Sequence, residues 1–278
     1  MLYVVATPIG NLEDLSPRAR RVLAEVDVIA AEDTRRTRAL LTHFGVAGKE
    51  LVALHAHSEA RDVVRLASRL REGASVAIVS DAGTPGVSDP GDALVRAAIE
   101  LGVRVVPIPG PSATLAALSA SGLSSGGAFR FLGFLPRDGR DRAEAIARAC
   151  DTPEPVVILE AANRVQNTLK DLAAATPDRP ACVARELTKV HEELSRGTLA
   201  ALAADAREWV GEVVLVLGAH DPAARAEAID DAALDARIDA ELAAGAHAKV
   251  AAERVAAWSG RPKREVYARV VARRTAGR

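Results

Sequence analysis

The clearest indication of how this chain folds is the stretch Ser80-Asp81-Ala82-Gly83-Thr84-Pro85-Gly86-Val87-Ser88-Asp89-Pro90-Gly91. It follows an apolar run, residues 75–79, that predicts a buried parallel strand, and it precedes residues 92–101, whose apolar spacing predicts a helix. Three glycines and two prolines within this stretch exclude the interior of a strand or helix, so it predicts a strand-to-helix loop. In an open parallel sheet, ligands bind beyond the carboxyl ends of the strands, where such loops lie. We therefore expect a ligand site here, with Asp81 at the strand end.

The flanking sequence repeats this strand-and-helix pattern through residues 1–119. Apolar runs predict strands at residues 2–6, 28–31, 51–54, 75–79 and 103–108. Segments with helical spacing separate them, at residues 15–26, 37–44, 59–71 and 92–101. This alternation indicates a doubly wound parallel sheet, and thus a first α/β domain over residues 1–119. Most of its strand ends carry polar or glycine-rich loops, which we expect to converge on one edge.

A composition break at residues 120–127, Ala-Ser-Gly-Leu-Ser-Ser-Gly-Gly, predicts a domain boundary. Residues 120–224 predict a second α/β domain, with strands at 129–135, 156–160, 181–187, 193–198 and 212–217. Helices are expected between some of them, at residues 140–149, 165–175 and 199–208. Because only a turn-sized gap precedes residue 193, we expect this second sheet to be mixed rather than all parallel.

Residues 225–278 predict a small, basic, helical C-terminal domain. Helices are expected near residues 230–243, 246–259 and 263–273, with the last two arranged as in a helix-turn-helix. From residue 248 onward, nine Lys/Arg face two Asp/Glu, whereas residues 230–241 are acidic. Two interpretations stay open: a solvated, arginine-rich cap, or a surface that contacts RNA phosphates. The second assigns phosphate contacts to Arg261, Lys263, Arg264, Arg269, Arg273 and Arg274.

Bulk composition excludes several classes of protein. The 278 residues carry a net charge of −1, and 31 of the 36 basic residues are arginine, so a compositional bias weakens any argument from arginine clusters alone. Cys150 and Cys182 lack metal-ligand spacing and a histidine cluster, so we expect neither a disulfide framework nor a metal site. No cleavable leader or membrane-length apolar run is seen, and we expect a cytoplasmic protein.

Seven motifs in chain order carry a resemblance to a known family. They are Ala6-Thr7-Pro8-Ile9-Gly10-Asn11, Glu32-Asp33-Thr34-Arg35, Ser80 to Gly91, Pro109-Gly110-Pro111-Ser112-Ala113, Phe131-Leu132-Gly133-Phe134-Leu135-Pro136, Arg185-Glu186-Leu187-Thr188-Lys189 and Gly211-Glu212-Val213-Val214. Together they resemble the tetrapyrrole (corrin/porphyrin) methylase superfamily and, within it, the ribosomal RNA small subunit methyltransferase I branch. One departure is Glu160-Ala161-Ala162-Asn163-Arg164, where the family usually has Glu-Ser/Ala-Pro-His-Arg.

The resemblance implies two α/β domains that bind S-adenosylmethionine, usually in a homodimer. It also implies transfer of a methyl group to the ribose 2′-hydroxyl of a cytidine at the decoding centre of 16S rRNA. By position, it assigns cofactor contacts to Ile9, Asp81, Gly83, Thr84, Ser112, Ala113, Leu159, Ala184 and Leu217. Since guanidinium groups match phosphate oxygens, RNA contacts are expected from Arg35, Arg36, Arg164 and Arg185, besides the C-terminal basic residues.

A ribose hydroxyl needs a general base to become a good nucleophile. The candidates at loop positions are Glu32, Asp33, Glu186 and Lys189, together with His57, Glu59, Glu160 and His191, and the sequence does not choose among them. Two alternative functions remain open. One is a small-molecule methylase acting on a tetrapyrrole precursor, and the other is a nucleic-acid-binding protein without catalysis. The glycine-rich loops disfavour the latter, and the basic tail disfavours the former.

Overall fold

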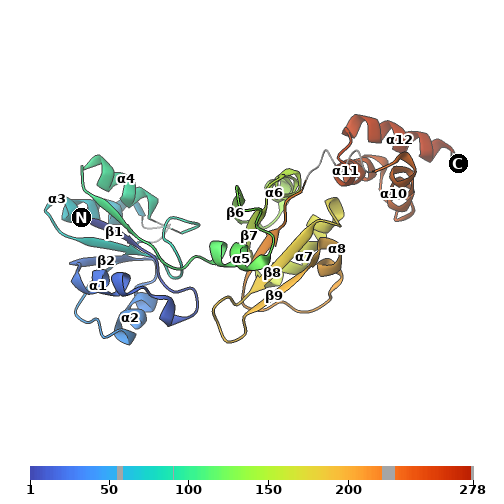
Figure 1. Cartoon of the computed structure of the whole chain (residues 1–278). Coiled ribbons are helices and arrows are strands. Elements are labelled where there is room, and N and C mark those ends of the chain that lie inside the picture. The colour runs from blue at the N-terminus through green and yellow to red at the C-terminus, as the bar shows by residue number, and fades with distance from the viewer. Residues whose placement is uncertain (55–58, 90, 221–228, 277–278) are drawn as a thin grey trace. The chain divides into compact units, whose positions relative to one another are not determined.

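The chain folds into two compact units, each built around a five-stranded sheet (Figure 1). The computed structural model describes residues 1–54, 59–89, 91–220 and 229–276. The first unit comprises Met1–Ala116 with Glu186–Glu192, and the second comprises Ala117–Arg185 with Glu193–Arg278. Because the C-terminal helices are grouped with the second sheet, the separate third domain from residue 225 onward stays a prediction.

The first sheet is entirely parallel, in the order β3-β2-β4-β1-β5, as expected for a doubly wound fold. Its strands are β1 (Leu2–Val5), β2 (Val28–Ala31), β3 (Glu50–Ala53), β4 (Val76–Val79) and β5 (Val105–Ile108). Helices α1 (Pro17–Glu25) and α2 (Thr34–His43) cover one face, and α3 (Glu59–Arg71) and α4 (Asp92–Glu100) cover the other (Figure 1). Alternate strand residues therefore enter two separate apolar cores, which is why the strands read as continuous apolar runs.

Local capping sets where the helices of this unit begin. Ser16 caps α1 by accepting from the Ala19 N–H, with Pro17 at the first helical position, as the sequence predicts. Helix α2 begins three residues earlier than predicted, because the Asp33 carboxylate accepts from the Arg35 N–H and caps it. A short 3-10 helix, η1 (Leu12–Asp14), precedes α1. Helix α5 (Ala113–Ser121) was not predicted, since its alanine-rich sequence has almost no amphipathic pattern.

The stretch of residues 80–91 is the predicted strand-to-helix loop, between β4 and α4. Gly83 has a φ of 83° and Gly91 a φ of 134°, values that residues with a Cβ rarely adopt. Among the described residues of this loop, Ser88, with a φ of 66°, is the one non-glycine residue with a left-handed backbone. The glycines are therefore needed for the shape of the loop.

The second sheet is mixed, in the order β6-β7-β10-β8-β9, which confirms that prediction. Its strands are β6 (Arg130–Phe134), β7 (Val156–Ala161), β8 (Pro180–Arg185), β9 (Glu193–Thr198) and β10 (Glu212–Leu217). Only β6 and β7 are parallel, and β10 runs antiparallel to both β7 and β8. The core of this sheet includes residues of α6 (Gly139–Asp151), α7 (Ala162–Ala175) and α8 (Leu199–Ala204).

Arg179 is buried in this second unit, with 2% of its surface exposed. Its guanidinium has no carboxylate partner in the described residues and donates instead to backbone carbonyl oxygens, those of Ala149, Cys150, Thr152, Glu154 and Gly218, at 2.7–3.4 Å. Burial lowers its pKa to about 10, so it stays charged at neutral pH. One side chain thereby supplies hydrogen-bond donors to backbone carbonyl oxygens at the end of α6 and in two loops.

The C-terminal helices are α10 (Asp231–Ala243), α11 (Ala248–Ser259) and α12 (Lys263–Ala276). They enclose a small apolar core of their own, which includes Leu234, Ile238, Val255, Val266 and Val270. Gly260, in the left-handed conformation, ends α11. Within the described residues, no helix is both long enough and apolar enough to cross a membrane.

Candidate active site

The loops at the carboxyl edge of the first sheet lie next to one another because of the strand order. Strands β2, β4, β1 and β5 are consecutive neighbours, so the segments that follow them are adjacent along this edge. These segments carry four of the seven sequence motifs. The structure therefore brings together the first-unit residues predicted to bind the cofactor: Ile9, Asp81, Gly83, Thr84, Ser112 and Ala113.

Backbone hydrogen bonds tie the β1 and β4 loops together. Thr7 N–H donates to the Gly83 carbonyl at 2.9 Å, and Gly83 N–H donates to the Thr7 carbonyl at 3.0 Å. A Cβ atom placed on Gly83 would lie 3.4 Å from the Ile9 side chain and 3.8 Å from the Pro111 carbonyl oxygen. The Thr84 hydroxyl donates to that same carbonyl at 3.1 Å. Three predicted loops thus meet around Gly83.

A fourth motif reaches the same place from the β8–β9 connection. This segment, residues 186–192, belongs to the first unit although its flanking strands belong to the second. Asn11 N–H donates to the Thr188 hydroxyl at 3.0 Å, and a Cβ atom on Gly10 would lie only 2.5 Å from Lys189 Cγ. Glu186 and Thr188 have φ values of 50° and 67°, strained for residues other than glycine. Backbone strain of this kind gathers at functional sites.

Carboxylates and one arginine line the side of this edge next to β2. Asp81 Oδ1 accepts from the Asp33 N–H at 2.9 Å, and Glu32 Oε2 accepts from the Asp81 N–H at 3.2 Å. The Arg36 guanidinium lies 3.3 Å from the other oxygen of Asp81. Hydrogen bonds from the Arg35 side chain and backbone lower the pKa of Asp33 to about 2. Asp33 is therefore a poor proton acceptor, whereas Asp81 is oriented from both sides.

Asp89 lies in the predicted strand-to-helix loop but is not among the site residues predicted from the sequence. Burial, followed by the nearby charge of Glu32, raises the pKa of Asp89 to about 6, while a hydrogen bond from Ser80 opposes this rise. A carboxyl group that titrates so close to neutrality suits proton transfer. The predicted parallel sheet could have pointed to Asp89. Glu32 and Asp81 follow neighbouring strands, and Asp89 lies in the same loop as Asp81.

The remaining candidate bases differ in their surroundings. Glu186 lies 2.9 Å from Lys189 Nζ in an ion pair, and both side chains are mostly buried. Glu160 has a wholly buried side chain that accepts from the Thr168 hydroxyl at 2.7 Å and pairs with Arg164 at 3.0 Å. His191 is exposed. His57 lies outside the described residues, as does the side chain of Glu59.

The second sheet carries three predicted cofactor contacts, of which two lie in one row. Leu159 of β7 and Ala184 of β8 both stand opposite Val214 of β10. Leu217, in contrast, stands opposite Val156 and Ala181, at the other end of the sheet. The reason is that β10 is antiparallel, so its carboxyl end lies beside the starts of β7 and β8. The motif Gly211–Val214, at the start of β10, is the part that lies near Leu159 and Ala184.

Two arginines predicted to grip phosphates are held by their own unit. Arg164 donates to the carbonyl oxygens of Leu135 and Pro136, at 2.6 and 2.9 Å, besides its pair with Glu160. Arg185 is 3.4 Å from Glu193, which also binds Arg207 at 2.6 Å. Arg35 and Arg36 are far more exposed, with 90% and 69% of their side chains accessible. Of these four arginines, the two on α2 are therefore the more accessible to a phosphate.

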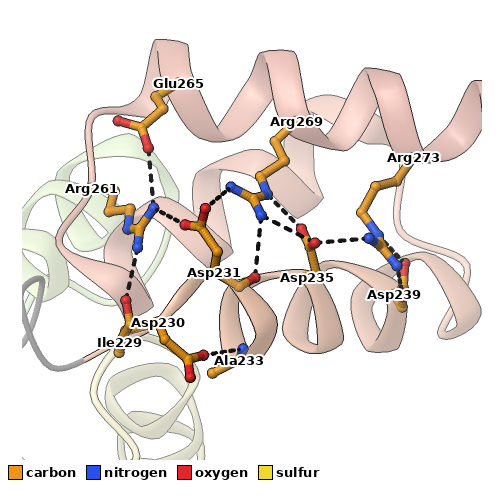
Figure 2. A network of polar contacts seen from close by, with 10 residues as sticks. All are labelled: Ile229, Asp230, Asp231, Ala233, Asp235, Asp239, Arg261, Glu265, Arg269 and Arg273. Atoms are coloured by element: carbon orange, nitrogen blue, oxygen red, sulfur yellow. Dashed lines mark hydrogen bonds and ion pairs between the residues drawn. The ribbon is translucent and has the colours of Figure 1, made fainter.

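The C-terminal arginines form a ladder of ion pairs with the acidic helix α10 (Figure 2). Arg261 lies 2.7 Å from Asp231, Arg269 binds Asp231 at 3.1 Å and Asp235 at 2.5 Å, and Arg273 binds Asp235 and Asp239. Lys263 binds Glu253 at 2.5 Å. Much of the basic charge counted from residue 248 onward is thus neutralised inside the helical bundle. No group of three or more potential metal ligands occurs in the part of the chain described.

Comparison with known proteins agrees with this geometry. Residues 1–203 match the family model of Tetrapyrrole (Corrin/Porphyrin) Methylases. The chain is 47% identical over 272 residues to the Ribosomal RNA small subunit methyltransferase I of Xylella fastidiosa, covering 96% of this chain and 97% of that protein. Its counterpart from Halalkalibacterium halodurans is 43% identical over 270 residues, covering 96% and 93%.

A solved structure shows the same fold. It is the uroporphyrin-III C-methyl transferase from Thermus thermophilus complexed with S-adenyl homocysteine, with a TM-score of 0.55 and 22% identity, covering 78% of this chain and 96% of that one. The chain belongs to the tetrapyrrole methylase family and, within it, to the branch of the ribosomal RNA small subunit methyltransferase I proteins. The predicted α/β fold class is confirmed.

Proposed function

We propose that this protein transfers a methyl group from S-adenosylmethionine to the ribose 2′-hydroxyl of a cytidine at the decoding centre of 16S rRNA. The observation that carries the proposal is the 47% identity over 97% of a ribosomal RNA small subunit methyltransferase I. That match extends through the C-terminal helices, whereas the tetrapyrrole family model ends at residue 203. The whole architecture, not only its α/β part, is therefore shared with the rRNA-directed relatives.

The carboxyl edge of the first sheet fits the cofactor. A Cβ atom on Gly10 would clash with the neighbouring loop, Gly83 has a positive φ that disfavours other residues, and Ile9 supplies an apolar wall with 8% of its surface exposed. Backbone groups and a small apolar surface suit a nucleoside with a methionine side chain. When bound, the cofactor supplies a methyl group on a sulfonium, a strong leaving group, so alignment of the acceptor is the main demand on the protein.

Removal of the hydroxyl proton is the second demand. Of the predicted bases next to Asp81, Glu32 remains once Asp33 is set aside for its low pKa, and Asp89 is a further carboxyl group near Glu32. The pKa of Asp89 is raised to about 6, and we propose Asp89 as the general base. Glu186 and Lys189 are proposed to orient the acceptor, since their ion pair lies on the strained segment that packs against Gly10.

The other parts of the proposal concern RNA, assembly and location. Arg35 and Arg36 on α2, with their exposed guanidinium groups, are proposed to bind phosphates of the small ribosomal subunit. Arg164, Arg185, Arg261, Lys263 and Arg264 remain predicted RNA contacts. We further propose a homodimer in the cytoplasm, on the family resemblance alone.

The test is transfer of a tritiated methyl group to small ribosomal subunits from cells lacking the modification, followed by mapping of the modified nucleotide. Label on one cytidine ribose is the expected result, with none on subunits that already carry the modification. A free tetrapyrrole precursor serves as the competing acceptor, because the solved relative is named as a uroporphyrin methylase. Label on the tetrapyrrole and none on the subunit would overturn the proposal. Sedimentation of the same preparation as a single 29.1 kDa species at micromolar concentration would contradict the dimer.

A further inference from the structure

Helix α12 has two faces of different character. The inner face contributes Val266 and Val270, both wholly buried, to the core of the C-terminal helices. Beside them, Arg269 and Arg273 turn toward α10 and form the ion pairs of Figure 2. The outer face carries four exposed residues: Arg264, Tyr267, Val271 and Arg274. Their spacing of three, four and three residues places them on one stripe along the helix.

The two faces also differ in how their charge is balanced. Every inner arginine has an aspartate of α10 within ion-pair distance. Among the described residues, no such carboxylate partner is found for Arg264 or Arg274. The one acidic residue of α12, Glu265, lies 3.3 Å from Arg261 and so faces away from the stripe. The outer stripe therefore carries uncompensated positive charge on the most basic helix of the bundle.

The side chains between these two arginines add a second feature. Tyr267 is 45% exposed and Val271 42% exposed, so an aromatic ring and an aliphatic side chain are accessible between the two arginines. Arginine with an interleaved aromatic ring is the combination that binds single-stranded nucleic acid: guanidinium groups hold phosphates, and the ring stacks on a base. The two arginines are ten positions apart, which is roughly 15 Å along the helix.

We propose that the outer face of α12, formed by Arg264, Tyr267, Val271 and Arg274, is the surface of the C-terminal helices that contacts single-stranded RNA of the substrate. This inference rests on the proposed function and names the part of the tail that serves it. Arg261, Lys263, Arg269 and Arg273 then hold the bundle together, because their charge is already matched by carboxylates. Among the six tail residues predicted from sequence to contact phosphates, Arg264 and Arg274 are the two assigned to RNA.

The central test compares the double variant Arg264→Gln/Arg274→Gln with a matched control, Lys170→Gln/Lys249→Gln. The control removes the same charge from exposed positions on α7 and α11. Michaelis constants for small ribosomal subunits are measured between about 50 and 200 mM salt. The double variant is expected to raise KM, with a log–log salt slope smaller by roughly 1.4, which is two phosphate contacts at about 0.7 each. The control is expected to leave both unchanged.

Two variants of Tyr267 test whether its ring stacks on a base. Tyr267→Leu is expected to raise KM about tenfold, because stacking of a base on an aromatic ring contributes about 1–3 kcal/mol, while Tyr267→Phe keeps the ring and is expected to match the wild type. If these residues only stabilised the bundle, Tyr267→Leu and the double variant would both have a lower melting temperature. The proposal therefore requires that both variants melt at the wild-type temperature. Binding of S-adenosylmethionine is expected to be the same in all variants.

Fluorescence anisotropy with a labelled single-stranded oligoribonucleotide separates failure of this inference from failure of the proposed function. If the wild type binds the RNA but methylates no small subunits, the proposed function falls, and a reduced salt slope in the double variant still supports the RNA face. If the folded double variant keeps the wild-type salt slope and KM, the inference is overturned. A changed sedimentation coefficient in the double variant would also overturn it, since the stripe would then join two copies of the chain.

Discussion

The carboxyl edge of the first sheet and the C-terminal helices are both rich in polar residues, yet they are held together differently. At the sheet edge, loops meet through backbone groups and close approaches at glycine, such as the reciprocal Thr7–Gly83 hydrogen bonds. In the C-terminal helices, partly exposed arginines pair with aspartates across α10 and α12 (Figure 2). Glycine-rich motifs therefore predict geometry well, because few other residues fit. A count of basic residues predicts a nucleic-acid surface poorly, because the same charges can be balanced inside the fold.

The largest effect is expected at Arg179. Its guanidinium donates hydrogen bonds to backbone carbonyl oxygens, which makes it a side-chain counterpart of the backbone hydrogen bonds between the loops of the first sheet. Arg179→Met would leave several buried carbonyl oxygens without a donor, so we expect a loss of about 3–5 kcal/mol of unfolding free energy. Chemical denaturation of the full chain measures it, with Arg148→Met, at an exposed position on α6, as the control. An equally small change in both variants would show that the buried arginine is dispensable.

The next largest effect tests whether the strained segment 186–192 must pack on the first-sheet edge. Gly10 and Gly127 both have ordinary φ values, but only Gly10 has atoms within 4 Å of a built Cβ. Gly10→Val is expected to displace Thr188 and Lys189 and to slow methyl transfer about 100-fold, as a misplacement of about 1 Å can. Gly127→Val is expected to leave the rate unchanged. Equal rates in the two folded variants would show that this contact does not matter.

A smaller effect is expected from the ion-pair ladder of the C-terminal helices. Arginine hydrogen bonds, above all from Arg269 to Asp235, lower the aspartate pKa values below the ordinary 3.8. The stability that these pairs contribute is therefore present above pH 3.8 and is lost as pH falls through the lower, folded values. Asp235→Asn is expected to speed amide hydrogen exchange in α12 at pH 7.

High salt should reduce the difference that Asp235→Asn makes, because the pairs are solvent-exposed. Hydrogen-exchange mass spectrometry on the full chain reports α12 and the first sheet together. Strands β1 and β4 are expected to exchange at the same rate in both proteins. Unchanged exchange of α12 at pH 7 would mean that its apolar core alone holds the bundle together.

The smallest effect concerns Asp89. Its pKa of about 6 lies above the ordinary 3.8, so the folded state loses stability as pH rises through this range. Asp89→Asn removes the charge and is expected to raise the melting temperature at pH 8 but not near pH 3.5. If Asp89 is also the general base, the same variant loses methyl transfer while it becomes more stable. A variant that is stable and fully active would remove Asp89 from the proposed site.

The sequence predicted most of the fold because alternating apolar runs and glycine-rich loops are local signals. Strands β2, β9 and β10 begin and end where predicted, while α2 began three residues early because the cap at Asp33 was taken for a strand-end loop. The sequence predicts which candidate residues lie together only where parallel strands carry them to a common edge. Leu217 shows the limit, since the direction of β10 depends on pairing with β7 and β8, which no local pattern encodes.

Long-range pairing explains the other gaps. The sequence does not show which arginines form internal ion pairs, because the partners of Arg164 and Arg269, Glu160 and Asp235, are selected by packing. The pKa of Asp89 depends on Glu32, which lies far away in the chain and comes close only because β2 and β4 are neighbours. Such contacts become predictable only when the strand order is known.

Calorimetric titration with S-adenosylmethionine tests most directly whether the first-sheet edge is the cofactor site. The wild-type chain is expected to bind one molecule per chain. Gly83→Val should bind none, because its side chain would enter the space between Ile9 and the Pro111 carbonyl oxygen and would strain a backbone with a φ of 83°. Retained cooperative unfolding in that variant excludes simple misfolding. A folded Gly83→Val protein that binds the cofactor with wild-type affinity would contradict the account.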